Sequence, residues 1–120
     1  DFTIPSSNNN ILVETAGGLM SPVGNDFLAI DLIKHLGLPV ILVSSNYLGS
    51  INHTLLSIDS LQQRKIPIAG LVFSGEKNPS SETFILDHTS LPLLFRIPVI
   101  HSFNKESIAA LASQLNFKLS

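Results

Sequence analysis

The 120-residue sequence contains no cysteine, which excludes disulfide bonds, thiolate zinc sites and cysteine nucleophiles. Charge is also scarce: Asp, Glu, Lys and Arg make up only 13% of the residues, and the formal net charge is -2. Without a basic face, the chain is not expected to bind nucleic acid. No apolar run approaches the ~20 residues needed to cross a bilayer, so no membrane partner is expected. The absence of cysteine suits a reducing compartment, and we expect a cytoplasmic protein.

Three catalytic signatures are missing as well. A Walker A loop needs a glycine directly before its lysine, and none of the five lysines follows one. The sequence has no G-x-S-x-G nucleophile elbow, and its four histidines show no metal-ligand spacing such as H-E-x-x-H. These 120 residues are therefore not expected to contain a P-loop, a hydrolase-type serine or a histidine-based metal site.

The chain is rich in apolar residues, at 44%, which is enough for one domain with a buried core. Four short apolar runs start at residues 11, 40, 68 and 97, and so recur every 28 or 29 residues. They predict strands over 11–14, 40–45, 68–73 and 97–100. Because apolar and polar residues do not alternate in these runs, they are typical of a parallel sheet that is covered on both faces.

Helical patterns separate the strands and predict helices over 26–36, 50–65, 80–88 and 105–115. Gly37 suits the end of the first helix, and Ser50 and Asn104 suit the N-caps of the second and the last. Right-handed crossovers between repeated strand–helix units place helices over both faces of the sheet. We predict a single α/β domain over 1–120, with an open, doubly wound, mainly parallel sheet and a polar lead-in over 1–10.

Ligands bind such sheets beyond the carboxyl ends of the strands, so the residues after each run are candidate site residues. After the first run, Glu14 is followed by Gly17 and Gly18, where backbone can approach a ligand closely. A carboxylate at this point suits Mg²⁺ carried by a nucleotide, because Mg²⁺ prefers hard oxygen ligands. The alternative is that Glu14 only caps a tight turn between a strand and a helix.

Two later loops have similar alternatives. Gly49 stands at the start of a long amphipathic helix, whose free N–H groups and positive dipole end suit a carboxylate or phosphate. An ordinary helix start that binds only water fits the same residues. After the third run, Ser74 and Gly75 either line a base pocket or form a simple turn.

Five segments, taken in order, resemble dethiobiotin synthase, the ATP-dependent carboxylase of biotin synthesis. They are VETAGGLMSP (13–22), LGLPVILV (36–43), NYLGSINHTLL (46–56), IAGLVFSGE (68–76) and FRIPVI (95–100). The specific feature is GSINHTLL downstream of E-x-A-G-G. The resemblance implies a P-loop NTPase-like fold that is incomplete here, because the family's P-loop belongs to a preceding half. The chain would then be the C-terminal part of a larger domain.

The resemblance also implies a homodimeric ligase that uses Mg²⁺ and ATP to join CO₂ or bicarbonate to 7,8-diaminononanoate. A carbamate forms on one amine, ATP phosphorylates it, and the second amine attacks the mixed anhydride to close a cyclic urea. A carbamate oxygen is a poor leaving group until it is phosphorylated, so catalysis rests on placing the γ-phosphate and neutralising its charge. Without the P-loop half, we expect the 120-residue chain alone to be inactive.

By this resemblance, Glu14 is the catalytic carboxylate and the metal ligand on the phosphate side. The residues implied beside the diamine are Ala16, Gly17, Gly18 and Pro22. Those implied to receive its distal carboxylate are Gly49, Ser50, Ile51 and Asn52. The residues implied at the adenine are Ser74, Gly75, Ile97 and Pro98. We expect Glu14 and the helix start at Gly49 to face one shared crevice.

Three positions depart from the family pattern. Thr15 replaces the first glycine of the family's E-G-A-G-G, and its side chain crowds the turn. Phe84 stands near the position of a family tyrosine, but its side chain cannot form a hydrogen bond. Ser74 replaces an asparagine that reads adenine, and one hydroxyl offers fewer hydrogen bonds than an amide. Two alternative hypotheses stay open: a related P-loop amidotransferase or ligase domain, against which the 49–56 motif argues, and a non-catalytic α/β binding module.

Overall fold

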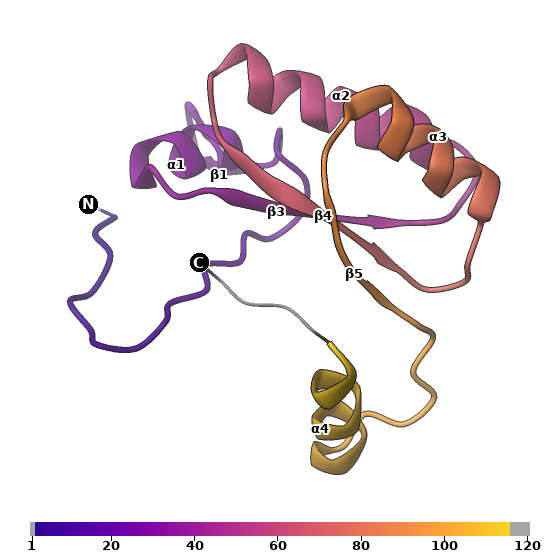
Figure 1. The fold of residues 1–120 in the computed structure, drawn as a ribbon. Helices are drawn as coiled ribbons and strands as arrows, with labels where there is room; N and C mark the ends of the chain where they lie inside the picture. The colour runs from indigo at the N-terminus through magenta and orange to yellow at the C-terminus, as the bar shows by residue number, and fades with distance from the viewer. Residues whose placement is uncertain (1, 116–120) are drawn as a thin grey trace.

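The computed structural model describes residues 2–115 (Figure 1). At its centre is a three-stranded parallel sheet in the order β3 (Val40–Ser45), β4 (Ile68–Ser74), β5 (Leu93–Ile97). The helices are α1 (Ala29–Leu36), α2 (Ser50–Gln63), α3 (Pro79–Thr89) and α4 (Lys105–Gln114). A short antiparallel pair, β1 (Pro22–Gly24) and β2 (Phe27–Leu28), precedes α1. The predicted α/β fold with a parallel sheet is confirmed.

Helices α2 and α3 pack together over one face of the sheet (Figure 1). Leu71 and Phe73 of β4 share that face because residues two apart in a strand point the same way. They form one buried cluster with Ile58 of α2 and Ile85 of α3. A second cluster anchors α1 to α2 and comprises Ile30, Leu61 and Ile66. The two clusters hold the strand–helix units together.

The remaining parts of the fold are more exposed. Val43 in β3 leaves 58% of its surface open to solvent. Helix α4 has no buried residue and lies well away from the sheet (Figure 1). It begins as the sequence predicts, at Asn104, whose side chain accepts a hydrogen bond from the Ser107 N–H at 2.8 Å. Local capping therefore defines the start of α4 without packing against the core.

The predicted strand over 11–14 was wrong, since these residues lie in no strand. Leu12 is 84% exposed. A strand requires a backbone partner, and in the described part of the chain β3 pairs with β4 alone. The last strand lies earlier than the predicted 97–100, because β5 covers Leu93–Ile97 and shares only its last residue with the prediction. It ends there since Pro98 has no N–H to donate to the sheet.

One buried carboxylate, that of Glu82 in α3, holds the ends of two strands. The Arg96 guanidinium donates to both of its oxygens, from Nη2 to Oε1 at 2.6 Å and from Nε to Oε2 at 3.1 Å. Just past β3, Asn46 Nδ2 donates to Oε1 at 2.7 Å, and the Asn78 N–H donates to the same oxygen at 3.0 Å. These donors, Arg96 above all, lower the pKa of Glu82 to about 2, although burial acts in the opposite direction.

The same two donor side chains also reach the end of β4. Arg96 Nη1 donates to the Gly75 carbonyl at 3.0 Å, and Asn46 Nδ2 donates to the Glu76 carbonyl at 2.8 Å. The amide hydrogens of Asn46 are then both used, while its Oδ1 is buried without a hydrogen-bond partner among the described residues. An unpaired buried acceptor costs about 1–3 kcal/mol. The orientation of Asn46 is therefore set by the two acceptors that Nδ2 holds.

Phe73→Ala should lower the free energy of unfolding by about 3–5 kcal/mol, because it leaves a cavity between α2, α3 and the sheet. Urea-induced unfolding followed by circular dichroism measures this loss. Phe103→Ala removes the same side chain where it is 78% exposed, and should change stability by less than ~0.5 kcal/mol. Equal losses in the two variants would contradict this description of the core.

Glu82 should make the stability of the fold depend on pH in the acidic range. Its pKa falls from 4.5 to about 2 on folding, so its ionised form stabilises the fold above pH 4.5. That contribution is lost as the pH falls from about 4.5 through about 2, and it is worth on the order of 3 kcal/mol. The free energy of unfolding, measured between these pH values, should no longer show this pH-dependent contribution in Glu82→Gln. The control Glu106→Gln, at an exposed position, should keep it. The same acid dependence in both variants would refute the assignment.

Candidate functional site

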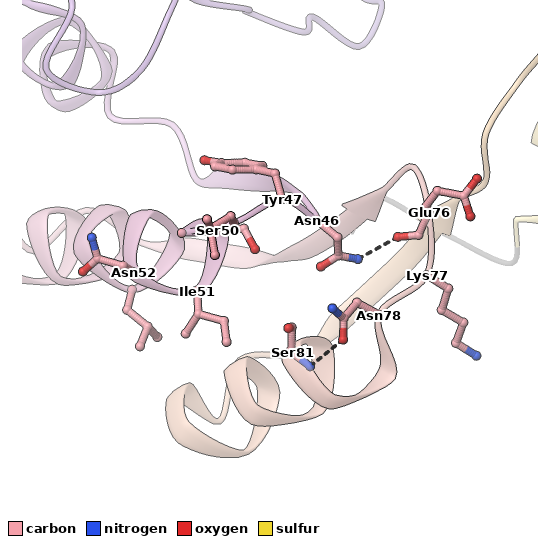
Figure 2. A pocket seen from close by; sticks show the side chains of 12 residues that line it. Asn46, Tyr47, Ser50, Ile51, Asn52, Glu76, Lys77, Asn78 and Ser81 are labelled. Atoms are coloured by element: carbon pink, nitrogen blue, oxygen red, sulfur yellow. Dashed lines mark hydrogen bonds between the residues drawn. The ribbon is translucent and has the colours of Figure 1, made fainter.

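A cavity of about 880 Å³ opens at the carboxyl ends of β3 and β4 (Figure 2). Its lining consists of residues 46–52 and Leu55 on one side, and of residues 76–78 and Ser81 on the other. Parallel α/β sheets bind their ligands at this edge. The four residues that the sequence assigns to a substrate carboxylate, Gly49, Ser50, Ile51 and Asn52, all line this cavity.

Gly49 shapes the start of α2. Its φ of 96° lies in the left-handed region that favours glycine, and the Ser50 N–H donates to the Tyr47 carbonyl at 3.0 Å, closing a turn. The N-cap of α2 is Gly49 and not the predicted Ser50, which is the first residue of the helix. The helix has no side-chain cap and no acidic residue in its first turn. Because the Ser50 N–H is already used in the bond to Tyr47, the N–H groups of Ile51 and Asn52 and the positive dipole end are what remain available to an anion in the cavity.

The helix start is held firmly against the sheet. Ser44 in β3 and Thr54 in α2 are both buried, and their hydroxyl oxygens are 2.8 Å apart in a hydrogen bond. This contact joins the end of β3 to the second turn of α2. The N–H groups at the cavity are thus presented by a fixed element, as a binding site for a carboxylate requires.

The other wall of the cavity comes from the loop after β4 and from α3. Figure 2 shows Asn78 and Ser81 across from α2, with the Ser81 N–H donating to Asn78 Oδ1 at 3.2 Å. Glu76 and Lys77 supply one charge of each sign, and the Lys77 side chain extends away from α2 (Figure 2). The start of α2 is consequently the feature of this cavity that favours an anion.

Sequence reasoning gave no role to Tyr47 and His53, which meet beside Gly49. Tyr47 Oη and His53 Nδ1 are 2.8 Å apart, and the two ring centres are 5.7 Å apart. A Cβ on Gly49 would lie 3.8 Å from His53 Cε1, so a larger side chain at this position would meet the histidine. The spacing of Tyr47 and His53 on either side of the helix start is the signal that could have revealed this pair.

The four residues assigned to adenine come together at the neighbouring strand ends. Ser74 is the register partner of Ile97 in the β4–β5 pair, and the Gly75 N–H donates to the Ile97 carbonyl at 2.9 Å. Pro98 follows directly. None of these residues lines the 880 Å³ cavity. The candidate site therefore has two neighbouring parts along one edge of the sheet.

The segment that begins at Glu14 is placed differently. Glu14 is exposed, and neither it nor any of the residues assigned to the diamine lines the cavity; those residues are Ala16, Gly17, Gly18 and Pro22. Gly17 has a φ of 78°, and the Ser21 N–H donates to the Gly18 carbonyl at 2.9 Å, so a turn does follow Glu14. Because residues 11–14 form no strand, the described structure does not bring Glu14 into the crevice that Gly49 lines.

Residues 2–115 contain no group of three or more acidic or histidine side chains that could hold a metal ion. A single carboxylate such as that of Glu14 still fits Mg²⁺, which usually keeps several waters and takes further oxygens from substrate phosphates.

The helices of residues 2–115 are all too short or too polar to cross a membrane.

Comparisons with known proteins agree with the resemblance. Residues 1–107 match the profile of the family described as AAA domain. The ATP-dependent dethiobiotin synthetase BioD of Cytophaga hutchinsonii is 41% identical over 113 residues, which are 93% of this chain and 55% of the relative. BioD of Campylobacter jejuni is 43% identical over 94 residues, 78% of this chain and 46% of the relative.

A third relative is the biotin biosynthesis bifunctional protein BioCD of Bordetella avium. It is 38% identical over 114 residues, which are 95% of this chain and 24% of the relative. The chain spans about half the length of the dethiobiotin synthetases that it matches. With its parallel sheet and its matched profile, the chain belongs to the AAA domain family, within the P-loop NTPase-like fold, and its resemblance to dethiobiotin synthase is confirmed.

Proposed function

We propose that this chain takes part in the ATP- and Mg²⁺-dependent carboxylation and ring closure of 7,8-diaminononanoate to dethiobiotin. The observation that carries the proposal is the 41% identity, over 93% of this chain, to a relative named ATP-dependent dethiobiotin synthetase. CO₂ or bicarbonate is the proposed carbon donor. A cytoplasmic homodimer is the proposed form of the enzyme.

The cavity at the start of α2 supports the assignment of the diamine's distal carboxylate. Gly49, Ser50, Ile51 and Asn52 line it, and the helix start is uncapped by any side chain. An anion there gains hydrogen bonds from N–H groups that otherwise have no partner within the helix. Binding at this end would orient the two amines at the other end of the substrate.

The pairing of β4 with β5 supports a nucleotide site at the neighbouring strand ends. Ser74, Gly75, Ile97 and Pro98 are proposed to contact the base, with the Ser74 hydroxyl as its polar partner. Glu14 is proposed to hold Mg²⁺, and the metal supplies positive charge that offsets the charge of the phosphates when it is bound. Ala16, Gly17, Gly18 and Pro22 are proposed to shape the backbone beside the diamine.

The chemistry requires a good leaving group on the carbamate carbon. Phosphorylation converts a carbamate oxygen into such a group, and attack by the second amine then closes the urea ring with release of phosphate. The chain has no Walker A segment to cradle the phosphates. We therefore propose that the full-length protein supplies this loop from outside these 120 residues, and that the chain alone does not turn over.

Glu14→Gln in the full-length enzyme should lower kcat by about a hundredfold, the scale expected when one group that offsets charge in the transition state is lost. Stability should change little, because Glu14 is exposed. Steady-state formation of dethiobiotin and thermal unfolding measure the two effects. Glu106→Gln is the matched control and should keep full activity. Retention of activity within a few-fold in Glu14→Gln would exclude the proposed metal-side role.

Gly49→Val should raise KM for the diamine at least ~10-fold more than KM for ATP, because the new side chain strains the turn and obstructs the carboxylate end. Gly37→Val provides a matched control. Gly37 also has a positive φ, of 66°, but it ends α1 with no atom near a new Cβ, so the ratio of the two KM values should stay unchanged. An equal rise of both KM values in Gly49→Val would count against a carboxylate site at this position.

A further inference from the structure

The hydrogen bonds of Glu82 connect the two parts of the candidate site. On one side, Arg96 donates to the carbonyl of Gly75, a residue assigned to the nucleotide. On the other side, Asn46 begins the loop that leads to Gly49 and the carboxylate cavity. Arg96 and Asn46 donate to the same oxygen, Oε1 of Glu82, at 2.6 and 2.7 Å. The two binding loops are thus connected through one carboxylate oxygen, beside the direct hydrogen bond from Asn46 to the Glu76 carbonyl.

This connection has little freedom to rearrange. Asn46 Nδ2 donates to both the Glu76 carbonyl and Glu82 Oε1, so a flipped amide would set an oxygen against two acceptors. Asn46 Oδ1 is buried without a hydrogen-bond partner among the described residues, and it offers no competing contact. Glu82 itself is 6% exposed and stays ionised at neutral pH, since its pKa is about 2. A shift of either loop must therefore move the shared carboxylate.

We propose that Glu82 is a positioning residue that makes nucleotide binding and binding of the diamine's carboxylate cooperative. The inference rests on the proposed function, because both ligands must bind for the coupling to exist. Because the network is tightly held, a ligand that shifts the β4–β5 end displaces Arg96 with it, and the shared carboxylate passes this displacement to Asn46 and the cavity. Thermodynamic linkage requires that each ligand raise the affinity of the protein for the other ligand by the same factor.

The test measures binding to the full-length protein by isothermal titration calorimetry. A non-hydrolysable ATP analogue and 7,8-diaminononanoate are each titrated alone and in the presence of the other at saturation. The wild-type protein should bind each ligand at least ~5-fold more tightly when the other is present, which is the lower end of usual allosteric coupling. Asn46→Leu breaks the link and leaves the Glu82–Arg96 pair in place. It should reduce the tightening to less than ~2-fold, with the affinity for the ATP analogue alone within ~2-fold of wild type.

Three further variants separate positioning from structural support. Glu82→Gln should also lose the coupling, and Asn46→Leu provides the test if Glu82→Gln does not fold. Glu106→Gln removes an exposed carboxylate and should keep it. Ile58→Val weakens the core without touching the hydrogen-bond network, so it should lower Tm and leave the coupling intact. Loss of coupling in Ile58→Val would show that general destabilisation is the cause and would overturn the inference.

The two proposals fail in different ways. Equal coupling in wild type and Asn46→Leu, or no coupling in a wild-type protein that binds both ligands, overturns the positioning role and leaves the proposed function standing. A wild-type protein that binds neither the ATP analogue nor the diamine overturns the proposed function as well.

Discussion

The ends of β3 and β5 meet α3 at the carboxylate of Glu82, and Arg96 links the end of β4 to this contact through the Gly75 carbonyl. Both parts of the candidate site depend on it. Burying a carboxylate is unfavourable unless it is paired and hydrogen-bonded. Here four donor contacts from Arg96, Asn46 and the Asn78 N–H satisfy it. The strand ends are therefore restricted to positions from which these donors reach α3. The geometry of the loops that follow those strands is fixed by the same restriction.

The candidate site has two parts, and neither contains a dense cluster of charged side chains. At Gly49, backbone N–H groups and the helix dipole offer positive potential from an element that Ser44 and Thr54 fix to the sheet. At Ser74, the end of the β4–β5 pair brings together residues from distant parts of the sequence. This arrangement fits a chain in which only 13% of the residues are charged.

Local patterns predicted most of the central elements. The apolar run over 40–45 is β3 itself, the run over 68–73 is β4 less one residue, and α2 ends two residues before the predicted 50–65. The run over 11–14 is equally apolar but has no strand partner among the described residues, so it forms no strand. A strand, unlike a helix, takes its hydrogen bonds from another segment, and composition alone does not say whether that segment is present.

The sequence by itself determined the class of the fold, the glycine at the start of α2 and the resemblance to dethiobiotin synthase. Each of these depends on residues that are contiguous in the sequence. Only the tertiary structure decided that Asn46 and Arg96 share the carboxylate of Glu82, which lies 36 and 14 residues away from them. It also decided that Glu14 stands outside the cavity that Gly49 lines. Burial and pairing of polar side chains depend on which elements pack together, and no periodicity along the chain encodes that.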